Sequence, residues 1–166
     1  SVTSIDTGAF FDCAKLVSVE IPSGVTRIED SLFYNCSSLV TVKIPEFLTS
    51  IGDNAFHSCS SLLSIRIPES VTLIGDRAFY ACSSLASLSF EASFLNGFGS
   101  DIFLSAGNAL EVIIGKNVTV IPEYLFSNAR ISNIEFEKGS VCREIGSMAF
   151  GNCSTIASIV YHGERN

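Results

Sequence analysis

The sequence predicts a right-handed α/β solenoid of seven repeats of 23–24 residues, with a parallel sheet on its concave side and short helices on its convex side. Three observations predict this fold: a recurring phenylalanine, an isoleucine five residues before it, and a Val-x-Ile type of alternation after it. The phenylalanine column comprises Phe10, Phe33, Phe56, Phe79, Phe103, Phe126 and Phe150. A period near 23 residues is typical of a solenoid, in which each repeat buries its apolar residues against its neighbours.

The whole chain, residues 1–166, is expected to form a single domain. The repeats span residues 2–24, 25–47, 48–70, 71–94, 95–117, 118–141 and 142–166. Proline and glycine are spread through them, so no linker is indicated. The first and last repeats carry the core columns without a polar cap, although repeat arrays normally need capping units. We therefore expect a fragment, or the mature part, of a longer protein.

Each repeat begins with the isoleucine column and a helix start. The isoleucine column is Ile5, Ile28, Ile51, Ile74, Phe98, Ile121 and Ile145. Two residues later stand Thr7, Asp30, Asp53, Asp76, Ser100, Glu123 and Ser147, most of which can cap a helix amino terminus. The Ala-Phe-x-x-Cys run that follows has apolar residues three apart, which predicts one or two helical turns packed behind the sheet.

A short strand follows the helix in each repeat. Val19 and Ile21 alternate with polar residues, and Pro22 directly follows them. Pro45 and Pro68 recur at the same place, where the missing backbone N–H would end a strand. Because each repeat offers one such strand, we expect seven parallel strands in register, about 4.8 Å apart.

Two stretches depart from the pattern. At Glu91–Phe94 the proline is absent and one residue is added, which predicts a bulge at the rim. Repeats five and six carry alanine where other repeats carry Cys or Leu, at Ala106, Ala109 and Ala129. Leu104 and Leu110 are candidates to fill that volume. Two alignments remain open for Leu110, one on the open face of the sheet and one in the core.

Composition and motifs exclude several functional classes. The net charge of −7 and the lack of a basic cluster argue against nucleic-acid binding. No apolar run reaches the roughly 18 residues of a membrane helix, so no membrane insertion is expected. His57 and His162 lie in distant repeats, and no phosphate loop, nucleophile motif or zinc spacing occurs. We expect no enzyme activity, no catalytic residue, no cofactor and no metal.

The cysteines form a column of their own. Cys13, Cys36, Cys59, Cys82 and Cys153 share one position that points toward the core. Buried cysteine behaves as a small hydrophobic residue, and bridging stacked parallel side chains would strain a disulfide. We therefore expect a ladder of free thiols.

The columns resemble the BspA-like, Treponema pallidum-type, class of leucine-rich repeats. The Ile-Gly-x-x-Ala-Phe-x-x-Cys-x-x-Leu-x-x-Ile-x-Ile-Pro run of this class stands nearly whole in residues 51–68 and 74–90. The resemblance covers all the repeats and implies an arc-shaped interaction module. It further implies a cell-surface or secreted adhesin that binds host or matrix proteins, and it carries no catalytic residue.

Candidate binding residues come from the open face of the sheet. An apolar column contains Val17, Val40, Leu63 and, in one alignment, Leu110, while Lys43, Arg66 and Ile113 occupy a third column on the same face. A hydroxyl-rich column lies between them. The apolar column either tucks under the preceding loop or forms a partner-binding patch. Lys43 and Arg66 lie on adjacent strands, and their repulsion is offset either by solvation or by an ion pair with Glu20 or a ligand carboxylate.

Three functional classes follow. The first is a surface or secreted recognition module that binds a protein ligand through the concave face. The second is an intracellular leucine-rich-repeat scaffold or regulatory domain, and the third is an accessory domain of an enzyme. A further aromatic row, Phe11, Tyr34, His57 and Tyr80, is expected on the convex side, where it either locks the helices together or forms a second binding surface.

Overall fold

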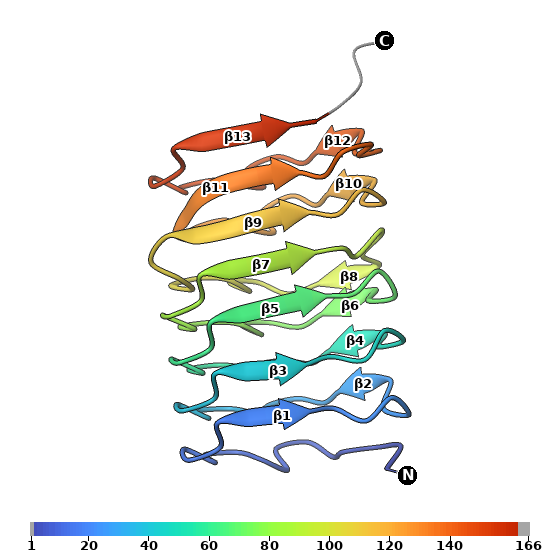
Figure 1. Cartoon of the computed structure of the whole chain (residues 1–166), viewed down its shortest axis with the longest axis vertical. Coiled ribbons are helices and arrows are strands. Elements are labelled where there is room, and N and C mark those ends of the chain that lie inside the picture. The colour runs from blue at the N-terminus through green and yellow to red at the C-terminus, as the bar shows by residue number, and fades with distance from the viewer. Residues whose placement is uncertain (1, 163–166) are drawn as a thin grey trace.

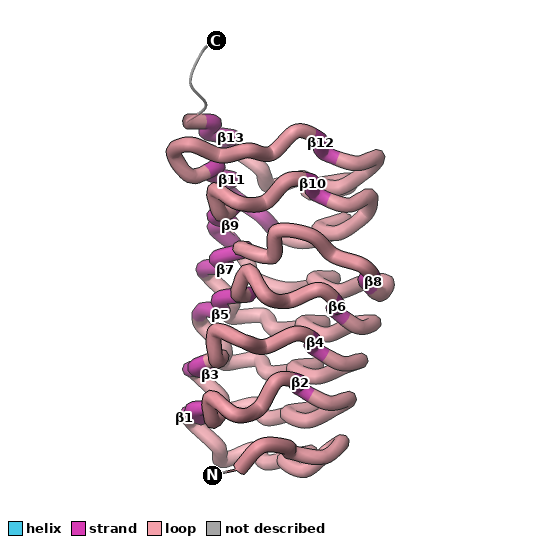
Figure 2. Tube along the Cα trace, turned by 90° about the vertical axis from the view of Figure 1, so that its right-hand side faces the viewer, coloured by secondary structure: helices cyan, strands magenta, loops and turns pink. Residues whose placement is uncertain are grey.

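A computed structural model describes residues 2–162, and its layers stack in a nearly straight column (Figures 1 and 2). Each layer contributes one strand to a long, seven-stranded parallel sheet, and about six turns of the chain join these strands. The strands are β1 (Ser18–Glu20), β3 (Thr41–Lys43), β5 (Ser64–Ile67), β7 (Ser87–Phe90), β9 (Leu110–Ile114), β11 (Ile131–Phe136) and β13 (Ser158–Tyr161). The predicted parallel pairing is confirmed, with Val19 opposite Val42 and Glu20 opposite Lys43.

Two short sheets line another side of the column. One contains β2 (Arg27–Ile28), β4 (Ser50–Ile51), β6 (Leu73–Ile74) and β8 (Gly97–Phe98), and the other contains β10 (Val120–Ile121) and β12 (Glu144–Ile145). The interruption between β8 and β10 follows the extra residue at Glu91–Phe94, and Figure 2 shows β8 out of line with its neighbours. Phe98 is 37% exposed, whereas Ile51 and Ile74 are buried. Phe98 still lies opposite Ile74 in the strand register, so the isoleucine column continues into this layer but leaves the core there.

The prediction of short helices on the convex side is wrong, because residues 2–162 contain no helix. The stretch that was expected to be helical is instead a run of turns with left-handed residues, such as Ser31 at φ 53° and Asn35 at φ 56°. Left-handed residues interrupt a right-handed helix. Their N–H groups donate to the next layer, from Ser31 to the carbonyl of Asp53 and from Asn35 to that of His57, both at 2.8 Å.

Layer spacing explains why turns replace helices. An α-helix is about 10 Å wide with its side chains, whereas parallel strands lie about 4.8 Å apart. Helices behind every strand would therefore spread the back of the stack and bend it strongly. The ring centroid of Phe56 lies only 5.3 Å from that of Phe33 and 5.2 Å from that of Phe79. The layers are therefore spaced nearly as closely at the back of the stack as in the sheet.

The residues expected to cap helices connect the layers instead. The Oδ1 atom of Asp30 accepts a hydrogen bond from the backbone N–H of Asp53 at 2.9 Å. Asp53 likewise accepts from Asp76 at 2.8 Å, and Asp76 accepts from Ser100 at 2.6 Å. A Cβ atom at Gly75 would lie 2.3 Å from Oδ1 of Asp53, so the glycine leaves room for this carboxylate. We call this series the aspartate ladder.

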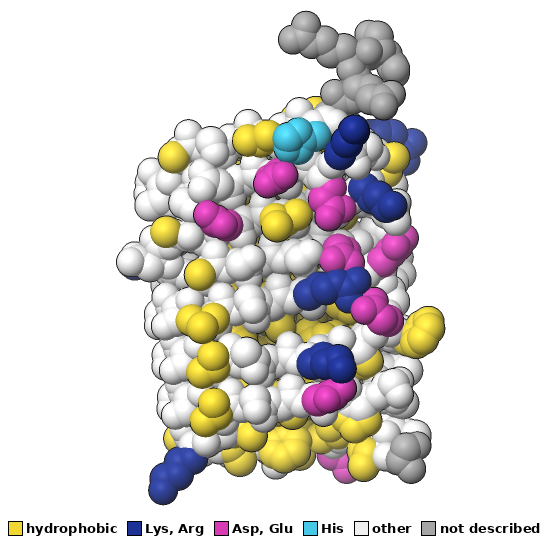
Figure 3. Space-filling view, viewed as in Figure 1, with side chains coloured by type: hydrophobic (Ala, Val, Ile, Leu, Met, Phe, Trp, Pro, Cys, Tyr) yellow, Lys and Arg dark blue, Asp and Glu magenta, His cyan; other side chains and the backbone are white. Residues whose placement is uncertain are grey.

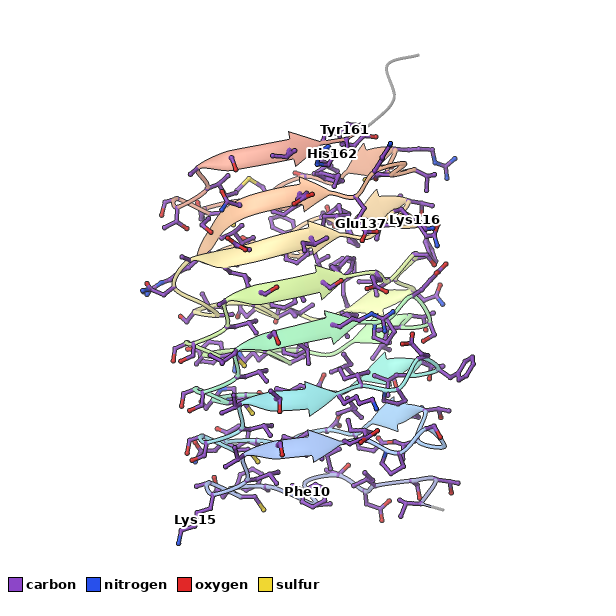
Figure 4. All side chains as sticks on the ribbon, viewed as in Figure 1. Phe10, Lys15, Lys116, Glu137, Tyr161 and His162 are labelled. Carbon is purple, nitrogen blue, oxygen red and sulfur yellow. The ribbon has the colours of Figure 1, made fainter. Side chains whose placement is uncertain are left out.

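The core runs unbroken up the centre of the column. The phenylalanine column forms a stack of rings with centroids 5.1–5.5 Å apart, beginning at Phe10 in the lowest layer (Figure 4). The cysteines are free thiols, as expected. Cys36, Cys59 and Cys82 each donate from Sγ to the carbonyl of a phenylalanine one layer below, at 3.1 Å. Burial raises the pKa of Cys59 to about 12.

Candidate protein-binding face

The outer face of the long sheet carries three parallel columns of side chains. Figure 3 shows apolar groups along one edge of this face and charged groups along the opposite edge. The strand register places the columns side by side, with Ser64 opposite Ser87 and Arg66 opposite Ser89. The sequence therefore identified the surface and its division into columns.

The apolar column is exposed in the first and third layers and partly buried in the second. Val17 is 56% exposed and Leu63 50% exposed, while Val40 between them is partly buried. The N–H of Val40 donates to the carbonyl of Val17 at 2.8 Å, and that of Leu63 donates to Val40 at 3.2 Å. The backbone thus fixes the three side chains in successive layers. No loop covers Val17 or Leu63, so the tucked-under alternative does not hold for these two.

Leu110 does not belong to this surface. It is fully buried and lies opposite Ile131 in the sheet, one position ahead of the bulge between Ile131 and Asn133. The alignment that places Leu110 in the core is therefore correct, and its inclusion among the surface candidates was wrong. Ala109 is exposed in its place.

In the charged column, Lys43 and Arg66 form ion pairs with nearby glutamates. Lys43 Nζ lies 2.6 Å from Glu20, and Arg66 contacts Glu46 at 2.7 Å and Glu91 at 2.5 Å. The hydrogen bonds that Arg66 donates to Glu91, and then those to Glu46, raise the pKa of Arg66. Burial alone would raise the pKa of Glu91, but hydrogen bonds from Arg66 and Ser89 lower it overall. The sequence identified Glu20 as a partner but missed Glu46 and Glu91, both of which stand just after a strand.

Ile113 stands apart from the other candidates. Its neighbours in the column are Ser89 and Glu135, and it is partly buried. With Val112, Ile134 and Val160 it lines a shallow hollow of about 280 Å³ on the upper half of the sheet. The structure therefore groups Val17, Val40 and Leu63 on one edge and Lys43 with Arg66 on the other, with Ile113 two strands beyond Arg66.

The outer aromatic row lies on the turn side of the column. Phe11, Tyr34, His57 and Tyr80 stack with ring centroids 4.6–4.8 Å apart. Burial, followed by the charge of Arg77, lowers the pKa of His57. Since the rings pack face to face, their largest surfaces cover one another, and the row acts first as a link between layers.

Sequence reasoning missed the most exposed aromatic side chain. Phe47 is 73% exposed in the loop that follows β3. The equivalent positions in the neighbouring repeats are Gly24 and Ser70. A large apolar residue between small residues in the two adjacent repeats was the signal that could have revealed it.

The described residues hold no obvious alternative chemistry. Within residues 2–162, no group of three His, Cys, Asp or Glu residues is placed to hold a metal ion. That same part of the chain contains no helix long and apolar enough to span a bilayer.

Comparison with known proteins agrees with this architecture. The model of the BspA type leucine-rich repeat region matches residues 1–106 and 49–165, in six copies. The crystal structure of the T. pallidum leucine-rich repeat protein is 30% identical, with a TM-score of 0.71, covering 90% of this chain and 69% of that one. No curated protein sequence matches the chain.

Two further solved structures are more distant. A leucine-rich repeat protein from Bacteroides ovatus is 22% identical, with a TM-score of 0.42, covering 98% of this chain and 59% of that one. A leucine-rich cell surface protein from Faecalibacterium prausnitzii is 24% identical, with a TM-score of 0.38, covering 99% and 65%. The chain thus spans 59–69% of the length of these three proteins. It belongs to the BspA-type leucine-rich repeat family, whose repeats form domains of the protein-interaction type.

Proposed function

We propose that the chain is the recognition domain of a cell-surface or secreted adhesin, and that the face of its long sheet binds a host or matrix protein. The observation that carries this proposal is the apolar column of Val17, Val40 and Leu63, in which Val17 and Leu63 are exposed and Val40 is partly buried. Large apolar side chains arranged together on a solvent-facing sheet cost solubility unless a partner covers them. Family membership supports a protein as that partner.

The face is preorganised for binding. β3 and β5 have parallel neighbours on both sides and β1 pairs with β3, and backbone hydrogen bonds join the three apolar residues. Association with such a surface orders little of the chain, so less binding free energy is lost to entropy. Val40 stands at the centre of the column, where interfaces concentrate their binding energy.

The polar columns suit the border of an interface. Ser18, Thr41 and Ser64 present exposed hydroxyl groups beside the apolar column. Beyond them stand the ion pairs of Lys43 and Arg66. An apolar strip bordered by polar and charged groups matches the core and rim of protein interfaces.

A double substitution tests the proposal. Val40→Asp with Leu63→Asp places two carboxylates in the column, and we expect binding to weaken by about 2 kcal/mol or more, roughly thirtyfold. The measurement is capture of partners from matrix and cell extracts, followed by titration of each recovered protein. Leu73→Asp with Met148→Asp is the matched control, since both residues are about half exposed and lie on other faces.

Circular dichroism must show that both double variants fold. If the Val40/Leu63 variant retains every partner of the parent, the long sheet is not the site. The outer aromatic row would then be the next surface to test.

An intracellular scaffold remains the second candidate, because all six cysteines are free thiols. A reducing compartment preserves such thiols without the protection of burial. Protease treatment of intact cells distinguishes the two, since only a surface protein is cleaved before lysis.

A further inference from the structure

We infer a second binding site, in the hollow beside Phe47, that takes a large apolar side chain flanked by basic residues in a peptide segment of a protein partner. The hollow lies between the loops that follow β1 and β3 and has a volume of about 570 Å³. Ile21, Pro22, Ile44, Pro45 and Phe47 form its apolar lining. It stands at the opposite end of the strands from the apolar column of Val17, Val40 and Leu63.

Comparison with the two adjacent repeats shows why the ring of Phe47 is uncovered. At the equivalent position the layers on either side carry Gly24 and Ser70, so no large neighbour covers the ring. Other aromatic residues on the surface, such as Tyr34 and Tyr80, stack against a ring in the next layer. Phe47 takes part in no such ring pair within residues 2–162 and remains 73% exposed. The loop does not need an aromatic residue for folding, because Ser70 serves in the next layer.

The apolar lining sets the first requirement on the occupant. Proline and isoleucine side chains offer rigid apolar walls, and an aromatic ring at the border offers a flat surface. Hollows of this kind receive the anchor residue of a protein partner, most often a large side chain that becomes fully desolvated.

The charges around the hollow set the second requirement. Glu20 and Glu46 line it together with a single cation, Lys43. Glu20 contacts Lys43 and Glu46 contacts Arg66, each through Oε1. The Oε2 atom of each glutamate accepts no hydrogen bond from the part of the chain that the structure describes. Two carboxylates with free oxygens beside an apolar hollow complement lysine or arginine next to the anchor.

Further carboxylates occur along the same edge, where they alternate with the cations of Arg66 and Lys116 (Figure 3). Glu69 and Glu137 follow in later loops, and Figure 4 shows Glu137 beside Lys116 at the edge of the column. The backbone N–H of Lys116 donates to Glu137 at 2.9 Å. A basic segment that anchors at Phe47 would therefore meet further carboxylates as it extends up the stack.

Three short peptides test the inference by NMR titration of the ¹⁵N-labelled chain. They are Ac-Arg-Trp-Arg-NH2, Ac-Glu-Trp-Glu-NH2 and Ac-Arg-Ser-Arg-NH2. We expect the first to bind with shifts centred on Ile44 and Phe47, and the other two to bind about tenfold more weakly. Raised salt should weaken the first peptide further.

The internal repeat supplies the variants. Phe47→Ser copies the residue at Ser70 and should reduce affinity for Ac-Arg-Trp-Arg-NH2 about tenfold. Phe94→Ser is the matched control, because Phe94 holds the same position two repeats later and is 57% exposed, yet does not line the hollow. The Val40→Asp, Leu63→Asp variant should bind the peptide like the parent, which separates this site from the proposed function.

Four outcomes would overturn the inference. The first is the absence of saturable shifts around Phe47, and the second is equal affinity for the Phe47→Ser and parent chains. The third is preference for Ac-Glu-Trp-Glu-NH2, which would show that the carboxylates do not select the ligand. Shifts at Phe47 with maltose of equal size to those with the peptide would point to a sugar-binding site and also overturn it.

Discussion

Replacing Phe56 by alanine should show how much the stack of phenylalanine rings contributes to stability. Phe56 is fully buried in the middle of the column. Its ring stacks on Phe33 at 5.3 Å and on Phe79 at 5.2 Å. The substitution therefore removes contacts with two layers at once, and the backbone hydrogen bonds between layers limit how far the site can collapse.

The expected cost follows from these contacts. Truncation of a buried phenylalanine to alanine costs about 3–5 kcal/mol, and aromatic pairs contribute about 0.5–1.5 kcal/mol each beyond burial. With two such pairs lost, we expect the upper part of that range, about 4–5 kcal/mol. For a chain of this size, 1 kcal/mol corresponds to about 2–4 °C in Tm, so the midpoint should fall by about 8–20 °C.

The control is Tyr80→Ala in the outer aromatic row. Tyr80 is partly exposed and stacks on His57 at 4.8 Å. Loss of this contact should cost about 1–2 kcal/mol, in the ordinary range of single substitutions. Urea unfolding monitored by circular dichroism measures the loss of stability in both variants. Equal shifts in the two variants would refute the assignment of Phe56 to the inside and Tyr80 to the outside.

Three further predictions concern titrating groups. In the native protein Cys59 and Cys82 should react with Ellman's reagent only as fast as the chain unfolds, because burial raises the pKa of both thiols; in urea all six thiols should react. Because hydrogen bonds from Arg66 lower the pKa of Glu91 in the folded state, their stabilisation is present above the usual glutamate pKa of about 4.3 and is lost as the pH falls through the folded pKa. Glu91→Gln should reduce the loss of stability at acid pH, measured as the urea unfolding midpoint from pH 7 to 3. An unchanged dependence of the midpoint on pH would contradict the role given to Glu91. Because burial lowers the pKa of His57, the unfolded chain takes up its proton first as the pH falls below about 6.5, so stability declines there; His57→Phe should remove this decline between pH 7 and 5 if the row stays stacked.

The sequence was sufficient to predict the parallel sheet because its determinants are local and repeated. The Val19 and Val42 positions recur at a fixed spacing, and fixed spacing forces in-register pairing. The same regularity identified the stacked rings and the cysteine column. These features depend on identical residues meeting identical neighbours, which a single sequence makes visible.

The helices were wrongly predicted because the same residues serve two different structures. Asp53 can cap a helix or accept a hydrogen bond from the next layer, and an apolar spacing of three suits either. The layer spacing decides between the two structures, because the back of the stack must keep nearly the same spacing as the strands in front. Residues such as Asn35 adopt left-handed conformations because the N–H group is then satisfied by His57 of the next layer.

The candidate binding face was predicted in part. Val17, Val40 and Leu63 were placed correctly on the outer surface, whereas Leu110 turned inward. That change depends on a bulge before Asn133, and a one-residue shift moves a side chain to the other face of a sheet. The hollow at Phe47 could not be predicted from apolar periodicity, since it arises where Phe47 breaks the periodicity.

The aspartate ladder gives the column a direction along its axis. It links Asp30 to Asp53, Asp76 and Ser100, and the outer aromatic row also ends in this half. In the described layers beyond Ser100, the corresponding Glu123 makes no equivalent side-chain link to the next layer. The ladder thus adds links between layers in the half where the strands are shorter, since β1 and β3 pair over three residues and β9 and β11 over five. A pulling force along the axis would therefore meet the carboxylate links in the lower layers and the longer strand pairing in the upper ones.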